Sequence, residues 1–200
     1  GSVREEAKAI VSGAATGGIG KRELLEIKIA EGLVEADGFD LIAMGRPEGP
    51  GCYCYANNVL REVIASLSGA YPWVIIDNEA GLENLSRRIV ASVDLLVLAS
   101  DPSANGLATL RRLHALAAEM DVSYGRLAVV ISRAAGETVR GAEEVKEAIG
   151  ARDLLIVPAS AEIARRAEEG MPLMDIHDDD AALRVIVNYI KKIAMEKTDG

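Results

Sequence analysis

The stretch LLVLASDPSANGLATLRRLHAL (Leu95–Leu116) contains the pattern that decides the fold. Its first five residues are an apolar run, which is typical of a strand buried on both faces of a parallel sheet. A turn of Ser, Asp and Pro follows, and leucines then recur every three residues from Leu107 onward, as they do on one face of a helix. The stretch therefore predicts a buried strand followed directly by a helix.

The same alternation of apolar runs and helical patterns extends over most of the chain. Short apolar runs that predict strands occur at Phe39–Met44, Trp73–Ile76, Leu127–Ile131 and Leu154–Val157. Helical patterns occur at Leu25–Leu33, Val59–Leu67 and Leu183–Ile193, and Asp180 is the expected N-cap of the last one. Strands that alternate with helices predict right-handed βαβ units, so we expect an α/β fold with a mostly parallel, twisted sheet flanked by helices.

The composition agrees with a single domain over residues 1–200. The chain is 50% hydrophobic but only 4% aromatic, so Ala, Val, Leu and Ile would fill its core. This is the mixture that covers both faces of a parallel sheet. The one flexible-looking stretch is SGAATGGIG at residues 12–20, and we expect the first 20 residues to be flexible.

The charge and the apolar runs exclude several classes of partner. The formal net charge is −9, which argues against nucleic acid, because phosphate backbones attract clustered cations. No apolar run approaches the length of a bilayer span. We therefore expect a cytoplasmic protein that binds neither nucleic acid nor a membrane.

The sequence Asp77-Asn78-Glu79-Ala80-Gly81 directly follows the apolar run that ends at Ile76. An Asp at the tip of a buried strand, with a Gly four residues later, is the Walker B and switch II arrangement of P-loop NTPases. There Asp77 would hold the Mg²⁺ shell, Glu79 would add a second carboxylate, and Gly81 would let the backbone approach the γ-phosphate. The alternative is that Asp77 simply caps a following helix.

The two cysteines, Cys52 and Cys54, are separated by one residue in the loop after Phe39–Met44. In an extended stretch residues i and i+2 point the same way, so both thiolates can bind one Zn²⁺, Ni²⁺ or Cu(I) ion. Two ligands do not complete a structural site, but a second copy of the chain across a two-fold axis would supply two more. The alternative is a pair of partly buried small residues.

A Walker A loop, GxxxxGK[ST], is not found in these 200 residues. The segment Gly17-Gly18-Ile19-Gly20-Lys21 approaches it, but Ala15 stands at the first Gly position and Arg22 replaces the Mg²⁺-binding Ser or Thr. We interpret it as an ordinary loop before a helix. Without that Lys and hydroxyl, we expect this chain alone not to hydrolyse ATP at a meaningful rate.

The stretches MGRPEGPGCYCYANNVLRE (Met44–Glu62) and VIIDNEAGLENLSRR (Val74–Arg88) resemble the carbon monoxide dehydrogenase maturation ATPases of the CooC type. These belong to the MinD-like class of dimeric P-loop NTPases, and the resemblance extends along essentially the whole chain. It implies ATP or ADP with Mg²⁺ as cofactor, with Asp77, Glu79 and Gly81 at the catalytic switch. It also implies that Ser132 and Arg133, and Pro158 and Ala159, lie where such proteins contact the base.

The resemblance further implies a nickel-handling role. In the family a divalent metal lies between two subunits on the CxC thiolates, here Cys52 and Cys54, as Ni or Zn. The client would be carbon monoxide dehydrogenase or its acetyl-CoA synthase assembly. Members of the family begin with a strand and a Lys-containing Walker A loop, so we interpret this chain as the C-terminal portion of such a domain. The alternatives are a non-hydrolysing, metal-binding dimer module and a MinD-like regulatory ATPase with incidental cysteines.

Overall fold

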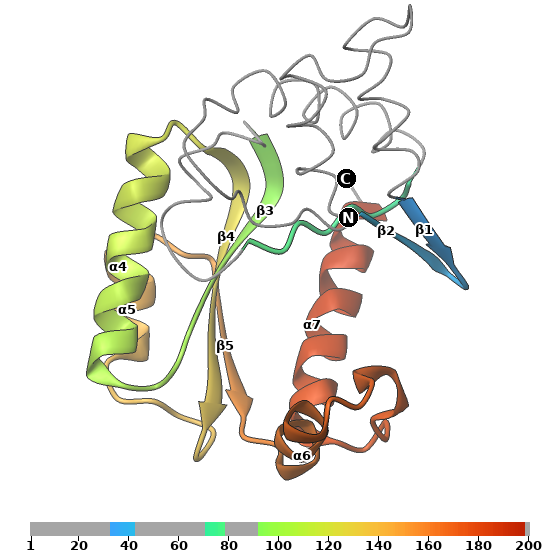
Figure 1. Cartoon of the computed structure of the whole chain (residues 1–200). Helices are drawn as coiled ribbons and strands as arrows, with labels where there is room; N and C mark the ends of the chain where they lie inside the picture. The colour runs from blue at the N-terminus through green and yellow to red at the C-terminus, as the bar shows by residue number, and fades with distance from the viewer. Residues whose placement is uncertain (1–32, 43–70, 79–91, 199–200) are drawn as a thin grey trace, which may run out of the picture. The chain divides into compact units, whose positions relative to one another are not determined.

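The computed structural model describes residues 33–42, 71–78 and 92–198 (Figure 1). The chain divides into two compact units, Gly1–Val90 and Ala91–Gly200, and each is described by itself below. The expectation of one domain over residues 1–200 stays a prediction.

The C-terminal unit is built on a parallel sheet of three strands in the order β3-β4-β5. The strands are β3 (Ser92–Ser100), β4 (Ser123–Ala134) and β5 (Asp153–Pro158). They contain the three apolar runs that predicted strands in this part of the chain, so the prediction of a parallel α/β fold is confirmed. The helices are α4 (Ala104–Glu119), α5 (Ala142–Ala148), α6 (Ala161–Glu169) and α7 (Ala181–Thr198), with a short 3-10 turn, η2 (Leu173–Asp175), before the last.

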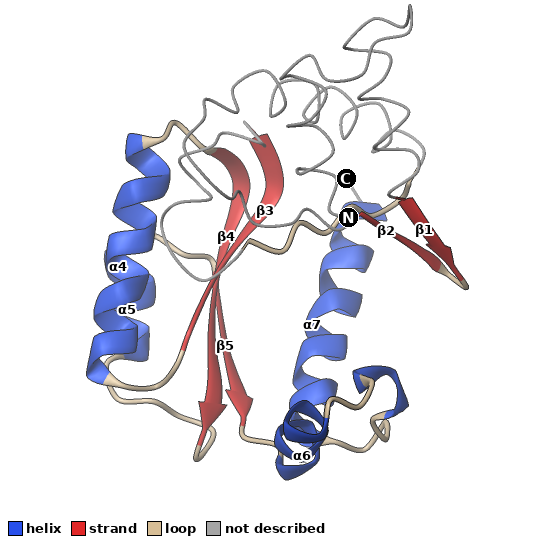
Figure 2. Cartoon of the chain, viewed as in Figure 1, coloured by secondary structure: helices blue, strands red, loops and turns tan. Residues whose placement is uncertain are grey.

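One face of this sheet packs against α4 and α5, as Figure 2 shows. Leu110 of α4, Val145 of α5, and Val129 and Ile131 of β4 are the largest fully buried side chains of the described residues. Leu107 is also buried, as the leucine spacing predicted. Burying aliphatic side chains of this size contributes about 1.5–3 kcal/mol each, so this layer holds the strands and α4 in fixed register.

The opposite face of the sheet is covered by α7 through Ala182, Val185 and Tyr189. The helical pattern at Leu183–Ile193 predicted this helix, and within it Ile186 and Ile190 are 40% and 46% exposed. The helix α7 therefore has apolar residues on two sides, and the packing partner decides which side is buried. Among the described residues, no helix is both long and apolar enough to cross a bilayer.

The described part of the N-terminal unit contains an antiparallel hairpin of β1 (Leu33–Ala36) and β2 (Phe39–Ile42). The expected buried parallel strand at Phe39–Met44 is therefore wrong in direction and environment, and Leu33 lies on a strand instead of a helix. The physical reason is the turn Asp37-Gly38, where Gly38 has φ 85°. Asp-Gly favours two-residue hairpin turns, and such turns join antiparallel strands only.

The run Trp73–Ile76 is also not a strand in this structure. It lies in the irregular segment over residues 71–78, where Ile75 is 87% exposed. The Tyr71 hydroxyl donates a hydrogen bond to the Asp40 carboxylate and so ties this segment to the hairpin. Strand-forming residues become a strand only where a neighbouring backbone supplies ladder hydrogen bonds, and the local sequence does not specify that neighbour.

Candidate functional site

The carboxyl edge of the three-stranded sheet is the candidate site. Because β3, β4 and β5 run parallel, their last residues Ser100, Ala134 and Pro158 lie at the same edge. Ligands of open α/β sheets bind at this edge. The four residues that the sequence assigned to nucleotide contact, which are Ser132, Arg133, Pro158 and Ala159, are all placed at these strand ends.

A β-bulge shapes the end of β4. Ile131 pairs with Ile156 but Ala134 pairs with Pro158, so β4 takes one residue more than β5 over the same distance. The extra length is taken up by Ser132 and Arg133, and Arg133 adopts a left-handed backbone with φ 60°. A left-handed residue other than Gly costs about 1–2 kcal/mol, and bulges near functional sites re-aim side chains.

The bulge leaves the Arg133 side chain 75% exposed, with its Nη2 atom 4.0 Å from Asp101 Oδ2. The neighbouring Ser132 Oγ donates a hydrogen bond to the Ser100 carbonyl oxygen at 3.3 Å, which links the ends of β3 and β4. The edge therefore presents one accessible guanidinium beside one carboxylate. The exposed guanidinium can stack on an aromatic ring or bind an anionic group of a ligand.

Asp101 is a site residue that the sequence analysis did not single out. Its Oδ1 atom accepts a hydrogen bond from the Ser103 backbone N–H at 2.8 Å, and Ser103 Oγ in turn caps α4 by accepting from the Gly106 N–H. Hydrogen bonds from Ser103 hold the pKa of Asp101 below its usual value, with a smaller contribution from Arg133. The available signal was the Asp-Pro-Ser turn at a helix start.

Gly106 lets the first turn of α4 approach Asp101 closely. A Cβ atom at this position would lie 2.4 Å from the Asp101 carbonyl oxygen and 2.5 Å from its Oδ1 atom. Both distances are far below van der Waals contact, so no other residue fits without a shift of the loop. The Asp101 carboxylate is therefore held between the β3 end and the helix start.

The end of β5 is fixed by two linked helix caps. Ser160 Oγ accepts from the Ile163 N–H at the start of α6 and donates to Asp180 Oδ2 at 2.6 Å. Asp180 Oδ1 accepts from the first turn of α7, from Ala182 N at 2.9 Å and Leu183 N at 3.0 Å. The predicted N-cap is thus confirmed. Hydrogen bonds from Ser160 and from this turn lower the pKa of Asp180.

The other expected site residues belong to the N-terminal unit, which is described by itself. Asp77 is exposed and belongs to the N-terminal compact unit, so it is described apart from this edge. Cys52, Cys54, Glu79 and Gly81 lie outside the described residues. In the part of the chain that the structure does describe, no three His, Cys, Asp or Glu side chains gather in a way that could hold a metal ion. The metal site on the cysteines stays a prediction.

The chain is similar to known ATP-binding proteins in fold and in sequence. Its fold is that of the Pyrococcus furiosus cell division ATPase MinD, with a TM-score of 0.58 over 94% of this chain and 80% of that one, at 15% identity. Its sequence is 36% identical over 198 residues to the uncharacterised ATP-binding protein MJ0685 of Methanocaldococcus jannaschii, which covers 98% of this chain and 78% of that protein. The chain belongs to the same family as this ATP-binding protein.

Other similarities agree with this family but extend over less of each protein. The chain is 31% identical over 159 residues to the uncharacterised ATP-binding protein MJ0823 of the same organism, of which it spans 60%. It is 32% identical over 92 residues to the carbon monoxide dehydrogenase accessory protein CooC of Rhodospirillum rubrum. These 92 residues are 44% of this chain and 35% of that protein. No family model matches the chain.

Proposed function

We propose that this MinD-like chain binds ATP with Mg²⁺ at the carboxyl edge of the β3-β4-β5 sheet. The observation that carries the proposal is the 36% identity, over 98% of the chain, to a protein named for ATP binding. In this proposal Ser132 and Arg133 contact the base from one side, and Pro158 and Ala159 from the other. Asp77, Glu79 and Gly81 serve the Mg²⁺ ion and the γ-phosphate.

The geometry of the edge supports this assignment of roles. The bulge leaves the guanidinium of Arg133 exposed, and a planar guanidinium stacks on aromatic rings as well as binding phosphate oxygens. Ala159 is exposed and Pro158 half-buried, so they offer a small apolar surface with little side-chain entropy to lose. Ser132 already donates its hydroxyl hydrogen to Ser100, which leaves oxygen lone pairs free to accept from an exocyclic amino group.

Calorimetric titration of the chain with ATP and Mg²⁺ tests the nucleotide proposal. We expect saturable binding, with about tenfold weaker affinity in Arg133→Ala, which corresponds to about 1.4 kcal/mol. Arg152→Ala is the matched control, because Arg152 is 65% exposed but lies just before the amino end of β5. No heat of binding, or an equal loss in both variants, contradicts the proposal.

We propose as a second, finer function that the chain handles nickel. The supporting observation is the 32% identity to the carbon monoxide dehydrogenase accessory protein over 92 residues. In this proposal Cys52 and Cys54 of two copies share one Ni²⁺ or Zn²⁺ ion in a homodimer, and the client is carbon monoxide dehydrogenase or an acetyl-CoA synthase assembly. A thiolate pair separated by one residue suits such a borderline-soft ion.

Metal analysis of the reduced chain at neutral pH tests the nickel proposal. We expect one Ni²⁺ or Zn²⁺ per two chains, together with a dimer in sedimentation. The double variant Cys52→Ala, Cys54→Ala should lose the metal and keep the far-ultraviolet circular dichroism of the original. A chain that binds no metal under these conditions contradicts the nickel role but leaves ATP binding to its own test.

A further inference from the structure

The connection between α6 and α7 carries three exposed apolar side chains. Met171 is 41% exposed, Leu173 53% and Met174 80%, and we call these three residues the apolar tip. Gly170, with φ 66°, ends α6 and turns the chain into the tip. Exposed apolar side chains are common singly, but three within four residues form a patch of the kind that marks a contact surface.

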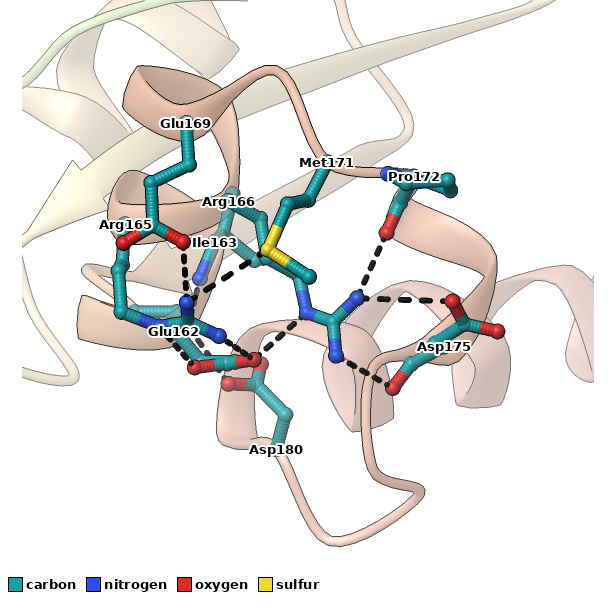
Figure 3. A network of polar contacts seen from close by, with 10 residues as sticks. Glu162, Ile163, Arg165, Arg166, Glu169, Met171, Pro172, Asp175 and Asp180 are labelled. Carbon is teal, nitrogen blue, oxygen red and sulfur yellow. Dashed lines mark hydrogen bonds and ion pairs between the residues drawn. The ribbon is translucent and has the colours of Figure 1, made fainter.

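A half-buried arginine holds the backbone of the tip in place. Arg166 is only 11% exposed, and its Nη1 atom donates to the Pro172 carbonyl oxygen at 2.8 Å while Nη2 donates to the Asp175 carbonyl oxygen at 3.0 Å (Figure 3). Its Nε atom donates to Glu162 Oε1 at 2.6 Å. One planar guanidinium therefore fixes both ends of η2 to α6, so the tip presents its side chains from a set backbone.

The guanidinium of a second arginine, Arg165, is also paired with carboxylates in this network. Arg165 donates to Glu162 Oε1 at 2.8 Å, pairs with Glu169, and approaches Met171 Sδ at 3.7 Å (Figure 3). Hydrogen bonds from Arg165 and then Arg166 lower the pKa of Glu162 to about 2. Both arginines of the segment are thus paired with carboxylates, Arg166 also with Asp175 at 3.7 Å, and two positive charges offset only part of the acidic charge around the tip.

The surroundings of the tip are strongly acidic. Residues 161–180 contain seven Asp and Glu against two Arg, a net charge of −5 in a chain whose total is −9. Asp175 and Asp179 next to the tip are 72% and 82% exposed. The net charge of residues 161–180, which an approaching partner meets at the tip, is therefore negative.

The negative charge of residues 161–180 favours some binding partners for the tip over others. A second copy of the chain would bring another −5 against the first, and anionic membranes and nucleic acids are repelled in the same way. A protein surface with Lys and Arg around an apolar hollow is attracted, and it buries the tip. Adaptable methionine side chains on a fixed backbone suit such a contact, because little order is lost on binding.

We propose that the apolar tip is a docking site for another protein, which presents an apolar pocket rimmed by Lys and Arg. The proposal goes beyond ATP binding and metal handling, since none of its residues belongs to either site. Met171, Leu173 and Met174 fill the pocket, and the carboxylates around them face the basic rim.

Selection of a displayed library of random 15-residue peptides against the whole chain tests the proposal. We expect the enriched peptides to combine apolar residues with Lys and Arg and to bind at least tenfold more weakly to Met174→Gln. Their binding should also weaken as salt rises from 50 to 500 mM, owing to screening. Met195→Gln is the matched control, because Met195 is 69% exposed on α7, and its affinity should be unchanged.

Two further variants test whether the fixed backbone and the acidic charge around the tip contribute to peptide binding. Arg166→Lys keeps the charge but cannot form the forked contacts to Pro172 and Asp175, so it should weaken binding with the apolar side chains intact. Asp179→Asn should lower the association rate with little effect on stability. Peptides that bind Met174→Gln as tightly as the original chain overturn the proposal. The proposal is also overturned if two copies of the chain form a dimer that dissociates on Met174→Gln, because the tip would then contact a second copy.

Discussion

At the scale of single residues, Arg133 combines backbone strain with an exposed charge. Its φ of 60° lies in the region that favours glycine, yet the position holds an arginine beside Asp101 at the carboxyl edge. A strained residue persists where the surrounding structure fixes it, and here the bulge between Ile131 and Ala134 does so. The strain is the cost of pointing a guanidinium out of a strand end.

Substituting Arg133 by Gly and by Ala separates that strain from the charge. Gly tolerates the left-handed backbone, so we expect Arg133→Gly to unfold with a free energy about 1 kcal/mol higher than Arg133→Ala in urea titration. Both variants should lose ATP affinity to the same extent. An Ala variant as stable as the Gly variant would show that the left-handed conformation is not strained.

Gly106 is the second residue with a position-specific role, because a Cβ there meets Asp101 at 2.4 Å. Helix propensity alone favours Ala over Gly by about 1 kcal/mol, so the two effects have opposite signs. We expect Gly106→Ala to lower the free energy of unfolding by about 1–3 kcal/mol, since the loop must shift.

The control for that substitution is Gly136→Ala, where a Cβ meets nothing within 4 Å. It should change the free energy of unfolding by less than about 0.5 kcal/mol in the same urea titration. A Gly106→Ala variant at least as stable as the original chain would mean that the approach of α4 to Asp101 relaxes freely.

At the scale of elements, the starts of α6 and α7 share one pair of caps. Ser160 and Asp180 each cap a helix and bond to one another at 2.6 Å. Because Ser160 directly follows Pro158 and Ala159, the proposed base-contacting loop is tied to α7 through this bond. We therefore expect a movement of the loop that contains Pro158 and Ala159 to displace the start of α7.

A double-mutant cycle with Ser160→Ala and Asp180→Ala measures this link. Each single variant should lose about 1 kcal/mol of stability, as caps do, and the double variant should lose at least 0.5 kcal/mol less than the sum. Thr109→Ala on α4, combined with Asp180→Ala, serves as the control pair and should be additive. Additive losses for Ser160 and Asp180 would mean that the two caps act independently.

At the scale of the whole C-terminal unit, a buried ion pair joins β4, β5 and α7. Arg126 Nη2 donates to Asp153 Oδ1 at 2.7 Å, Tyr189 Oη donates to Oδ2 at 3.2 Å, and Lys192 Nζ lies 3.3 Å from Oδ1. These contacts, above all those from Arg126, lower the pKa of Asp153 to about 2. Desolvation and the nearby Asp153 charge raise the pKa of Tyr189 to about 12.

The lowered pKa of Asp153 predicts a stability that depends on acid. A folded pKa below the unfolded value of about 3.9 stabilises the fold above about pH 4, and this stabilisation, about 2 kcal/mol, is lost as pH falls toward 2. Asp153→Asn should therefore be less stable than the original at pH 7. The difference in free energy of unfolding between Asp153→Asn and the original chain should decrease by about 2 kcal/mol as the pH falls from 7 to 2.

Urea titration of both proteins between pH 7 and pH 2 measures that narrowing. Asp179→Asn, which removes an 82% exposed carboxylate, is the control and should show no comparable change. A constant difference between Asp153→Asn and the original chain across this range contradicts the assignment of the acid-sensitive stability to Asp153.

The sequence by itself determined β3, β4, β5, α4 and α7 of the C-terminal unit, but it did not single out α5 or α6. Apolar runs of strand length fixed β3, β4 and β5, the leucine spacing fixed α4, and the position of Asp180 fixed the start of α7. These signals are local, because strand burial, helix periodicity and capping depend on residues within a few positions of one another. The family resemblance assigned Ser132, Arg133, Pro158 and Ala159 to base contact, and all four lie at the carboxyl ends of parallel strands, where ligands of such sheets bind.

Only the tertiary structure decided how these parts meet. The bulge that exposes Arg133 follows from the register of β4 against β5, and the Arg126–Asp153 pair joins residues 27 positions apart. The buried side of α7 depends on the sheet face it packs against, and Trp73–Ile76 lacks strand structure although its composition favours one. Register, packing partners and distant charges are set by contacts between segments, and a local pattern carries no information about them.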